Sequence, residues 1–261
     1  MIVKQDFRGR SGYLRGNEHD PTLVPGPGAI VASMTPRTIG IDGDDTLWES
    51  EAHFVTTTAK MVDLLSNWVH SSEAVERLMD VERRNLKTLG YGVNAFALSM
   101  IQTAIEVTNS EVSAPVIHQI IEWAKELMSH PVDLLDGVPE ALESLAEVSD
   151  LLLITKGDLL HQESKVARSG LAEFFRAIHI VSEKDPRTYQ RILDEHDVRA
   201  EEFMMVGNSM RSDVLPVVQL GGVGVYIPHN LTWELENVHE DNIPDEVVEL
   251  RCLGDVASLL E

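Results

Sequence analysis

From Pro131 to Ile227, short apolar runs alternate with amphipathic segments. The runs occupy residues 151–154, 178–181, 203–206 and 224–227, and helical periodicity fills residues 139–148, 159–169, 187–195 and 214–220. Strands joined through helices run parallel, because each helix carries the chain back across the sheet before the next strand begins. The alternation therefore predicts an α/β fold with a parallel sheet covered by helices.

A second pattern interrupts the first. Thr38 to Ile41 forms a β-prone run that ends at an acidic turn, but from Ser50 to Met128 the apolar residues recur at helical spacing. Two faces are clear: one holds Phe54, Thr58, Met61, Val62, Leu65 and Val69, and the other holds Val116, Ile117, Ile120, Ile121, Ala124 and Met128. With two amphipathic stretches between them, we expect about four helices. Residues 50–129 are thus a predicted helical insert in a core made of residues 38–49 and 130–261.

Residues 1–37 are rich in proline and glycine and show no sustained apolar periodicity, so they are expected to form an N-terminal extension. Met34 lies just before the first predicted strand, which leaves an upstream misassigned start as an alternative.

The composition restricts the partners. Asp and Glu number 43 against 21 Lys and Arg, giving a formal net charge of −22. Nucleic acids and anionic membranes would be repelled, so we expect neither as a partner. A phosphorylated substrate would also be repelled unless the site supplies local positive charge. Cys252 is the only cysteine and no signal peptide is recognisable, so the expected location is cytoplasmic. The expected oligomeric state is a monomer or a homodimer.

Four short motifs follow predicted strands, and the carboxyl ends of such strands are where open α/β sheets bind ligands. The first motif reads Asp42-Gly43-Asp44-Asp45-Thr46. A carboxylate at Asp42 could attack phosphorus, and Asp44 could serve as general acid and base. The alternative for such a motif alone is a solvated turn or a helix N-cap.

The second and third motifs offer positive charge and hydrogen-bond donors. Thr155 and Lys156 follow the strand at residues 151–154, and Lys184 follows the strand at residues 178–181. A hydroxyl, exposed amides and ammonium groups can hold phosphoryl oxygens and neutralise developing charge. Taken singly, a capping threonine and a surface lysine are the ordinary interpretations.

The fourth motif, residues 207–213, contains Asn208 and Asp213. Mg²⁺ prefers hard oxygen ligands, so a metal site made of Asp42, the Asp44 carbonyl, Asn208 and Asp213 is chemically reasonable.

Together these motifs resemble the four signature motifs of the haloacid dehalogenase (HAD) superfamily, over roughly residues 38–230. The resemblance implies a Rossmann-like core with an inserted all-helical cap domain. It also implies that Asp42 is nucleophile and metal ligand, Asp44 acid/base, Thr155 and Lys184 phosphate binders, and Asp213 part of a Mg²⁺ site. Asn208 departs from the pattern, because relatives commonly carry an acidic residue there.

The expected function is a Mg²⁺-dependent phosphatase that hydrolyses a small phosphorylated metabolite, a phosphomonoester, through an aspartyl phosphate. Asp44 favours this over the dehalogenase branch, which generally lacks the second aspartate. A phosphomutase, a dehalogenase of the same fold and a catalytically silent binding protein remain alternatives.

Several residues outside the motifs are weaker candidates for substrate contact. Trp48, His53 and Tyr91 could face the substrate, although packing or surface roles are the more ordinary interpretation. The basic residues Arg83, Arg84 and Lys87 on a cap helix could pair with an anionic substrate tail, or form a solvated helix face.

Overall fold

The computed structural model describes residues 36–236, 238, 243–244 and 247–260. Its centre is a six-stranded sheet in which all the pairs are parallel and the order is β3-β2-β1-β4-β5-β6. The strands are β1 (Thr38–Ile41), β2 (Asp150–Lys156), β3 (Ala177–Val181), β4 (Phe203–Gly207), β5 (Val223–Tyr226) and β6 (Val248–Glu249). The order places β1, the first of the described strands, in the interior of the sheet between β2 and β4.

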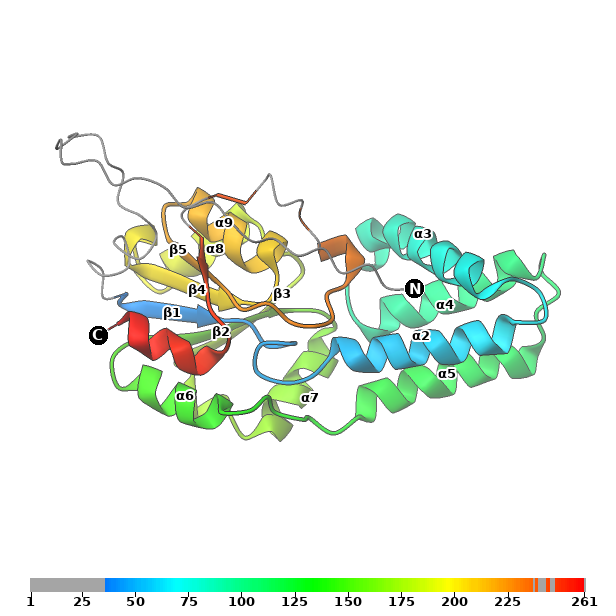
Figure 1. Ribbon diagram of the computed structural model, residues 1–261, viewed down its shortest axis with the longest axis horizontal. Coiled ribbons are helices and arrows are strands. Elements are labelled where there is room, and N and C mark those ends of the chain that lie inside the picture. The colour runs from blue at the N-terminus through cyan, green and yellow to red at the C-terminus, as the bar shows by residue number, and fades with distance from the viewer. Residues whose placement is uncertain (1–35, 237, 239–242, 245–246, 261) are drawn as a thin grey trace, which may run out of the picture.

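Helices cover both faces of this sheet (Figure 1). One layer contains α6 (Val138–Ala146), α7 (Leu159–Ser169) and the C-terminal 3₁₀ segment η6 (Leu253–Leu259), and the other contains α8 (Pro186–Glu195) and α9 (Leu215–Gln219). The shorter turns are η1 (Ala172–Phe174), η2 (Ala200–Glu202), η3 (Met210–Val214) and η4 (Glu234–Glu236).

Alternation along the strands produces two separate cores, because successive side chains point to opposite faces. On β2, Leu151 and Leu153 pack into the α6 and α7 layer, whereas Leu152 and Ile154 pack into the α8 and α9 layer. All four side chains are buried, which explains why the strand reads as an uninterrupted apolar run.

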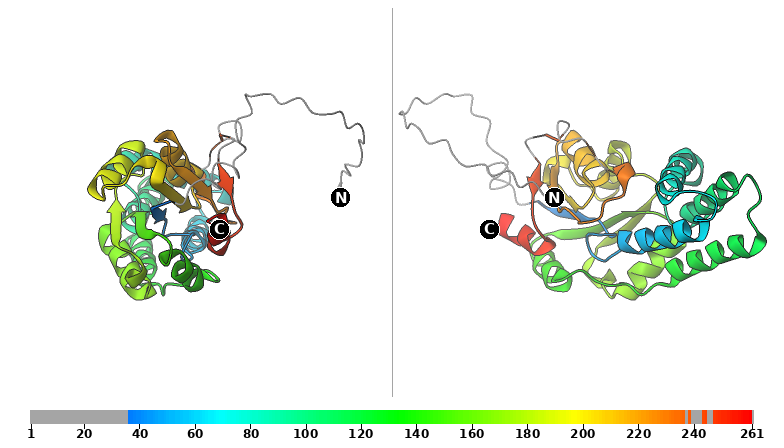
Figure 2. Two further views of the ribbon diagram at one scale, coloured as in Figure 1. Left: turned by 90° about the vertical axis from the view of Figure 1, so that its left-hand side faces the viewer. Right: turned by 45° about the vertical axis from the view of Figure 1, so that its right-hand side comes forward.

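The cap consists of α2 (Glu51–Leu65), α3 (Ser71–Leu89), α4 (Val93–Val107) and α5 (Ala114–Ser129). These helices pack around their own apolar cluster, which includes Met61, Leu78, Phe96, Met100 and Ile120. The cap projects from one end of the sheet, so that the molecule is elongated (Figures 1 and 2). The predicted fold class, a Rossmann-like parallel sheet with a helical cap, is confirmed.

The chain enters and leaves the cap through two adjacent segments. Glu49 N donates to Asp133 O at 2.9 Å, and Leu135 N donates to Leu47 O at 3.0 Å. An antiparallel bridge pairs Trp48 with Leu134. The two ends of the insert are therefore fastened to each other.

Differences from the expected elements are local. Most strands and helices begin or end one or two residues from their predicted limits. The helix predicted over residues 214–220 is α9, and the π-helical turn η3 that precedes it was not predicted. The two-residue strand β6 was not predicted. Apart from Pro36 and Arg37, the expected N-terminal extension lies outside the described residues. Within the described part of the chain, none of the helices combines the length and the apolar character needed to cross a membrane.

Candidate active site

Adjacent parallel strands bring the motifs to one edge of the sheet. Ile41, the last residue of β1, is in register with Leu153 on β2 and with Val206 on β4. Asp42 continues this register, since its N–H donates to Val206 O at 2.9 Å. The first motif therefore lies between the second and the fourth, as the strand order requires.

Lys184 joins two carboxylates in the floor of the site. Its Nζ lies 2.5 Å from Asp42 Oδ1 and 2.6 Å from Asp213 Oδ1, and all three side chains are buried. Burial raises the pKa of Asp42 to about 7; the charge of Asp213 adds to this, and Lys184 opposes it. Burial alone would lower the pKa of Lys184, but the two carboxylates raise it, so the lysine stays charged. One ammonium thus faces two carboxylates, so ionisation of both leaves one negative charge for a cation to neutralise.

Three donors hold the Asp44 carboxylate. Lys165 Nζ lies 2.5 Å and Trp48 Nε1 2.6 Å from Oδ1, and Gln162 Nε2 lies 2.9 Å from Oδ2. Burial would raise the pKa of Asp44, but the Lys165 charge and the three hydrogen bonds lower it below its ordinary value. Asp44 is therefore ionised before substrate binds.

The neighbouring Asp45 stabilises the start of helix α2. Its Oδ1 accepts hydrogen bonds from Ser50 N at 2.9 Å and Glu51 N at 3.1 Å, at the start of α2. The capping interpretation considered for the first motif thus applies to Asp45, although Asp45 borders the cavity together with Asp42 and Asp44.

Asn208 supplies the test of whether a divalent cation fits. The end of its side-chain amide lies 3.1 Å from Asp42 Oδ2 and 3.2 Å from the Asp44 carbonyl oxygen. With the amide nitrogen on that side, Asn208 donates to both oxygens. With the amide oxygen there, three oxygens converge, and only a cation between them would relieve their repulsion. Such a set suits a hard divalent ion.

Thr155 and Lys156 lie on opposite sides of the β2 end. Thr155 is buried beside Gly43, whereas Lys156 Nζ lies 2.5 Å from Glu236 Oε1 and 2.7 Å from Ser212 Oγ. The Lys156 ammonium also sits over the Tyr91 ring, 3.9 Å from its centroid. All the residues predicted for the site line one cavity, although Lys156 already has a carboxylate partner.

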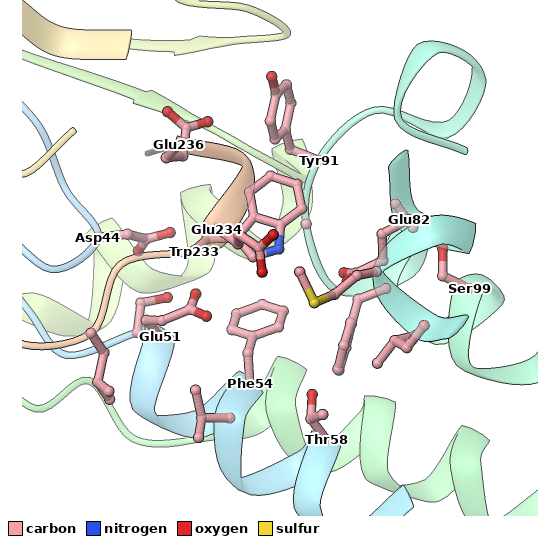
Figure 3. A pocket seen from close by; sticks show the side chains of 18 of the residues that line it. Asp44, Glu51, Phe54, Thr58, Glu82, Tyr91, Ser99, Trp233, Glu234 and Glu236 are labelled. Atoms are coloured by element: carbon pink, nitrogen blue, oxygen red, sulfur yellow. The ribbon is translucent and has the colours of Figure 1, made fainter. Parts of the chain in front are cut away.

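This cavity has a volume of about 1200 Å³ and lies between the core and the cap. Figure 3 shows Asp44 on one side, Phe54 and Glu82 on the cap side, and Trp233 between them. Tyr91 closes part of the boundary, because its hydroxyl donates to Glu183 Oε2 at 2.8 Å. The cap is therefore closed onto the core.

The weaker candidates for substrate contact lie elsewhere or have other partners. Trp48 is fully buried and holds Asp44 rather than substrate, and His53 borders a separate small hollow. Arg83 and Arg84 pair with acidic residues on exposed surface and do not border the cavity. Lys87 is exposed and outside the cavity as well.

Four residues that hold other site groups were missed by the sequence reasoning: Lys165, Gln162, Trp233 and Glu236. Lys165 and Gln162 lie in a helix that was predicted, but helical periodicity gives no sign of which polar residue points into a site. Trp233 and Glu236 belong to a segment with no recognised pattern.

The model of the haloacid dehalogenase-like hydrolase family matches residues 36–221. The chain belongs to this family. A HAD-like family hydrolase from Xanthomonas campestris is 42% identical, with a TM-score of 0.77 over 86% of this chain and 90% of that one. The family confirms an enzyme of the hydrolase class.

Other relatives of this HAD-like hydrolase differ in chemistry. A glyceraldehyde 3-phosphate phosphatase from Pyrococcus furiosus is 27% identical over 109 residues, which are 40% of this chain and 45% of that protein. The chain thus matches less than half of that curated relative. A 2-haloacid dehalogenase from Pseudomonas syringae is 21% identical, with a TM-score of 0.56 over 86% of this chain and 98% of the other, and this likeness shows the fold alone.

Proposed function

We propose that this HAD-like hydrolase is a Mg²⁺-dependent phosphatase that acts on a phosphomonoester through an aspartyl-phosphate intermediate. The observation that carries the proposal is the pair of aspartates at the end of β1. Asp42 lies beside Lys184, and Asp44 is held separately by Lys165, Trp48 and Gln162. A nucleophile and a distinct acid/base group are what phosphoryl transfer to a carboxylate and back to water requires.

In the first step an oxygen of Asp42 forms a bond to phosphorus, and the bond from phosphorus to the substrate alcohol breaks. The departing oxygen takes a proton from Asp44. Because Asp44 is ionised at rest, it must gain that proton as the substrate enters, and the negative charge of the phosphoryl group favours this by raising the pKa of the carboxyl.

In the second step a water molecule attacks phosphorus while Asp44 accepts its proton, and the bond between phosphorus and Asp42 breaks. Lys184 neutralises charge on Asp42 and on the transferred group, and Thr155 would donate a hydrogen bond to a phosphoryl oxygen. Asp42, the Asp44 carbonyl, Asn208 and Asp213 would hold Mg²⁺, which when bound would neutralise phosphoryl charge and orient the group.

Replacing Asp42 by Asn tests the proposal. We expect Mg²⁺-dependent release of phosphate from wild-type enzyme, and a loss of more than about 10³-fold in kcat for Asp42→Asn. Wild type quenched during turnover should carry a hydroxylamine-labile phosphoryl label that the variant lacks. Retention of the label in the variant would show that another group is the nucleophile.

The same assay separates the alternatives. Release of halide from 2-haloacids without added metal would indicate a dehalogenase, and dependence on a sugar bisphosphate activator would indicate a phosphomutase. Absence of any turnover would favour a binding protein.

A further inference from the structure

The cap side of the cavity differs chemically from the catalytic floor. Its walls are formed by side chains that are mostly hydrocarbon, contributed by three cap helices and by one core loop: Phe54, Val62, Leu78, Met79, Phe96 and Trp233. In Figure 3 the Phe54 and Trp233 rings both project into the space between cap and core. A ligand here would exchange water for apolar contacts.

The volume also leaves room for much more than a two- or three-carbon acid. About 1200 Å³ is above the roughly 300–1,000 Å³ of ordinary small-molecule pockets, and a phosphoryl group fills only a small part of it. The remaining space adjoins the apolar wall, so it would receive the alcohol part of the substrate.

Positive charge is confined to the floor. Among the described residues, the lysines that border the cavity are Lys156, Lys165 and Lys184, and each already lies within hydrogen-bond distance of a carboxylate. Arg83 and Arg84 of α3 pair with acids, and no arginine of α3 borders the cavity. A second phosphate or a carboxylate on the substrate would therefore meet no lysine or arginine on the cap side of the cavity, as far as the described residues go.

Two acidic side chains lie on the cap side of the cavity instead. Glu82 and Glu51 border the cap side, and Figure 3 shows both on the wall of the space. Burial raises the pKa of Glu82 to about 7, while a hydrogen bond from Trp233 opposes the rise. A positively charged or donating group on the substrate would find an acceptor at Glu82, and a negatively charged one would be repelled when Glu82 is ionised, above about pH 7.

We infer that the substrate is the phosphomonoester of a bulky apolar alcohol whose far end is uncharged or cationic, with the apolar part held against the cap. This rests on the proposed phosphatase function and narrows it. Small phosphorylated metabolites, the substrate class expected from the sequence, would then be poor substrates.

A series of n-alkyl phosphates of increasing length measures the apolar contribution. We expect kcat/KM to rise about three- to fourfold for each added methylene until the chamber is filled. At equal length, a terminal carboxylate should lower kcat/KM by about tenfold or more, and a terminal amine should not. A flat or falling dependence on length, or a preference for the carboxylate, would overturn the inference while leaving the phosphatase assignment intact. Release of phosphate from no member of the series would overturn both.

Two variants localise the effect. Met79→Gln keeps the side-chain volume but makes the wall polar, so the gain per methylene should shrink, whereas Leu98→Gln on the exposed outer face of the cap should leave that gain unchanged. Glu82→Gln should reduce the penalty for the terminal carboxylate. Thermal unfolding of each variant shows whether the cap is intact. An unaltered chain-length dependence in a folded Met79→Gln protein would place the apolar part of the substrate elsewhere.

Discussion

Lys184 is the only ammonium that contacts both Asp42 and Asp213 within the described residues, and its side chain is almost fully buried. Removing one member of a buried ion pair leaves the remaining charge unpaired in a poorly solvated place. For Lys184→Met we expect the free energy of unfolding without metal to fall by about 3–5 kcal/mol, measured by urea denaturation.

Lys60→Met is the matched control, because Lys60 also pairs with a carboxylate, Glu126, but on exposed surface. Such pairs contribute at most about 1 kcal/mol. Equal losses in the two variants would contradict the view that burial makes the Lys184 contacts strong.

Lys165 helps to keep the Asp44 carboxyl ionised. Its ammonium lowers the pKa of that carboxyl, so Lys165→Met should raise it. Because Asp44 acts as the acid in the first step, the alkaline limb of the profile of kcat/KM against pH reports loss of its proton, and this limb should move to higher pH. A pH series on both proteins checks this, and an alkaline limb that stays in place would separate Asp44 from the titration.

At the scale of single residues, the sequence predicted the site residues that directly follow strands, but not the residues that hydrogen-bond to them. Parallel strands must end at one edge, so Asp42, Thr155 and Asn208 could be grouped without coordinates. Lys165 and Gln162 could not, because they approach Asp44 across 121 and 118 positions of chain from a helix whose rotation depends on its packing.

Among the elements, the loop between α3 and α4 makes the contact that closes the cap. Gly92 has φ +103°, and a Cβ there would lie 2.7 Å from the backbone nitrogen of Asp158 in the core. Next to it, Asn94 N and Nδ2 each donate to the Asp158 carboxylate at 2.9 Å. A close approach of this kind requires glycine.

Gly92→Ala should therefore hold the cap away from the core and lower kcat/KM by about 10- to 100-fold, because the cap would no longer position the substrate. Gly90→Ala is the control: its φ of +72° imposes similar backbone strain, but a Cβ there meets no atom within 4 Å. Steady-state kinetics on both variants test this, and equal losses would attribute the effect to strain alone.

The elements themselves follow closely from local pattern. Helices with one apolar face and strands buried on both faces were identified, since burial fixes their periodicity. The strand β6 was not, because two residues carry no periodicity and Val248 and Glu249 pair with β5 only through the tertiary fold.

For the molecule as a whole, the net charge of −22 opposes the approach of a phosphate dianion. Salt screens that repulsion over a Debye length of about 10 Å at 0.1 M. We expect kcat/KM to increase as NaCl is raised from low concentration at constant free Mg²⁺, and to increase less for a substrate with a cationic end. A steady decrease would mean that local positive charge at the site outweighs the global field.

Hydrogen bonds and a β-bridge join residues 47–49 to residues 133–135. This junction has an evolutionary consequence. Because both ends of the cap leave the sheet side by side, the eighty or so residues between them form a cassette that can be lost, lengthened or exchanged without moving β1. Selection can thus alter what the enzyme recognises while Asp42 and Asp44 stay in place, and protein engineering can use the same junction to graft a foreign cap.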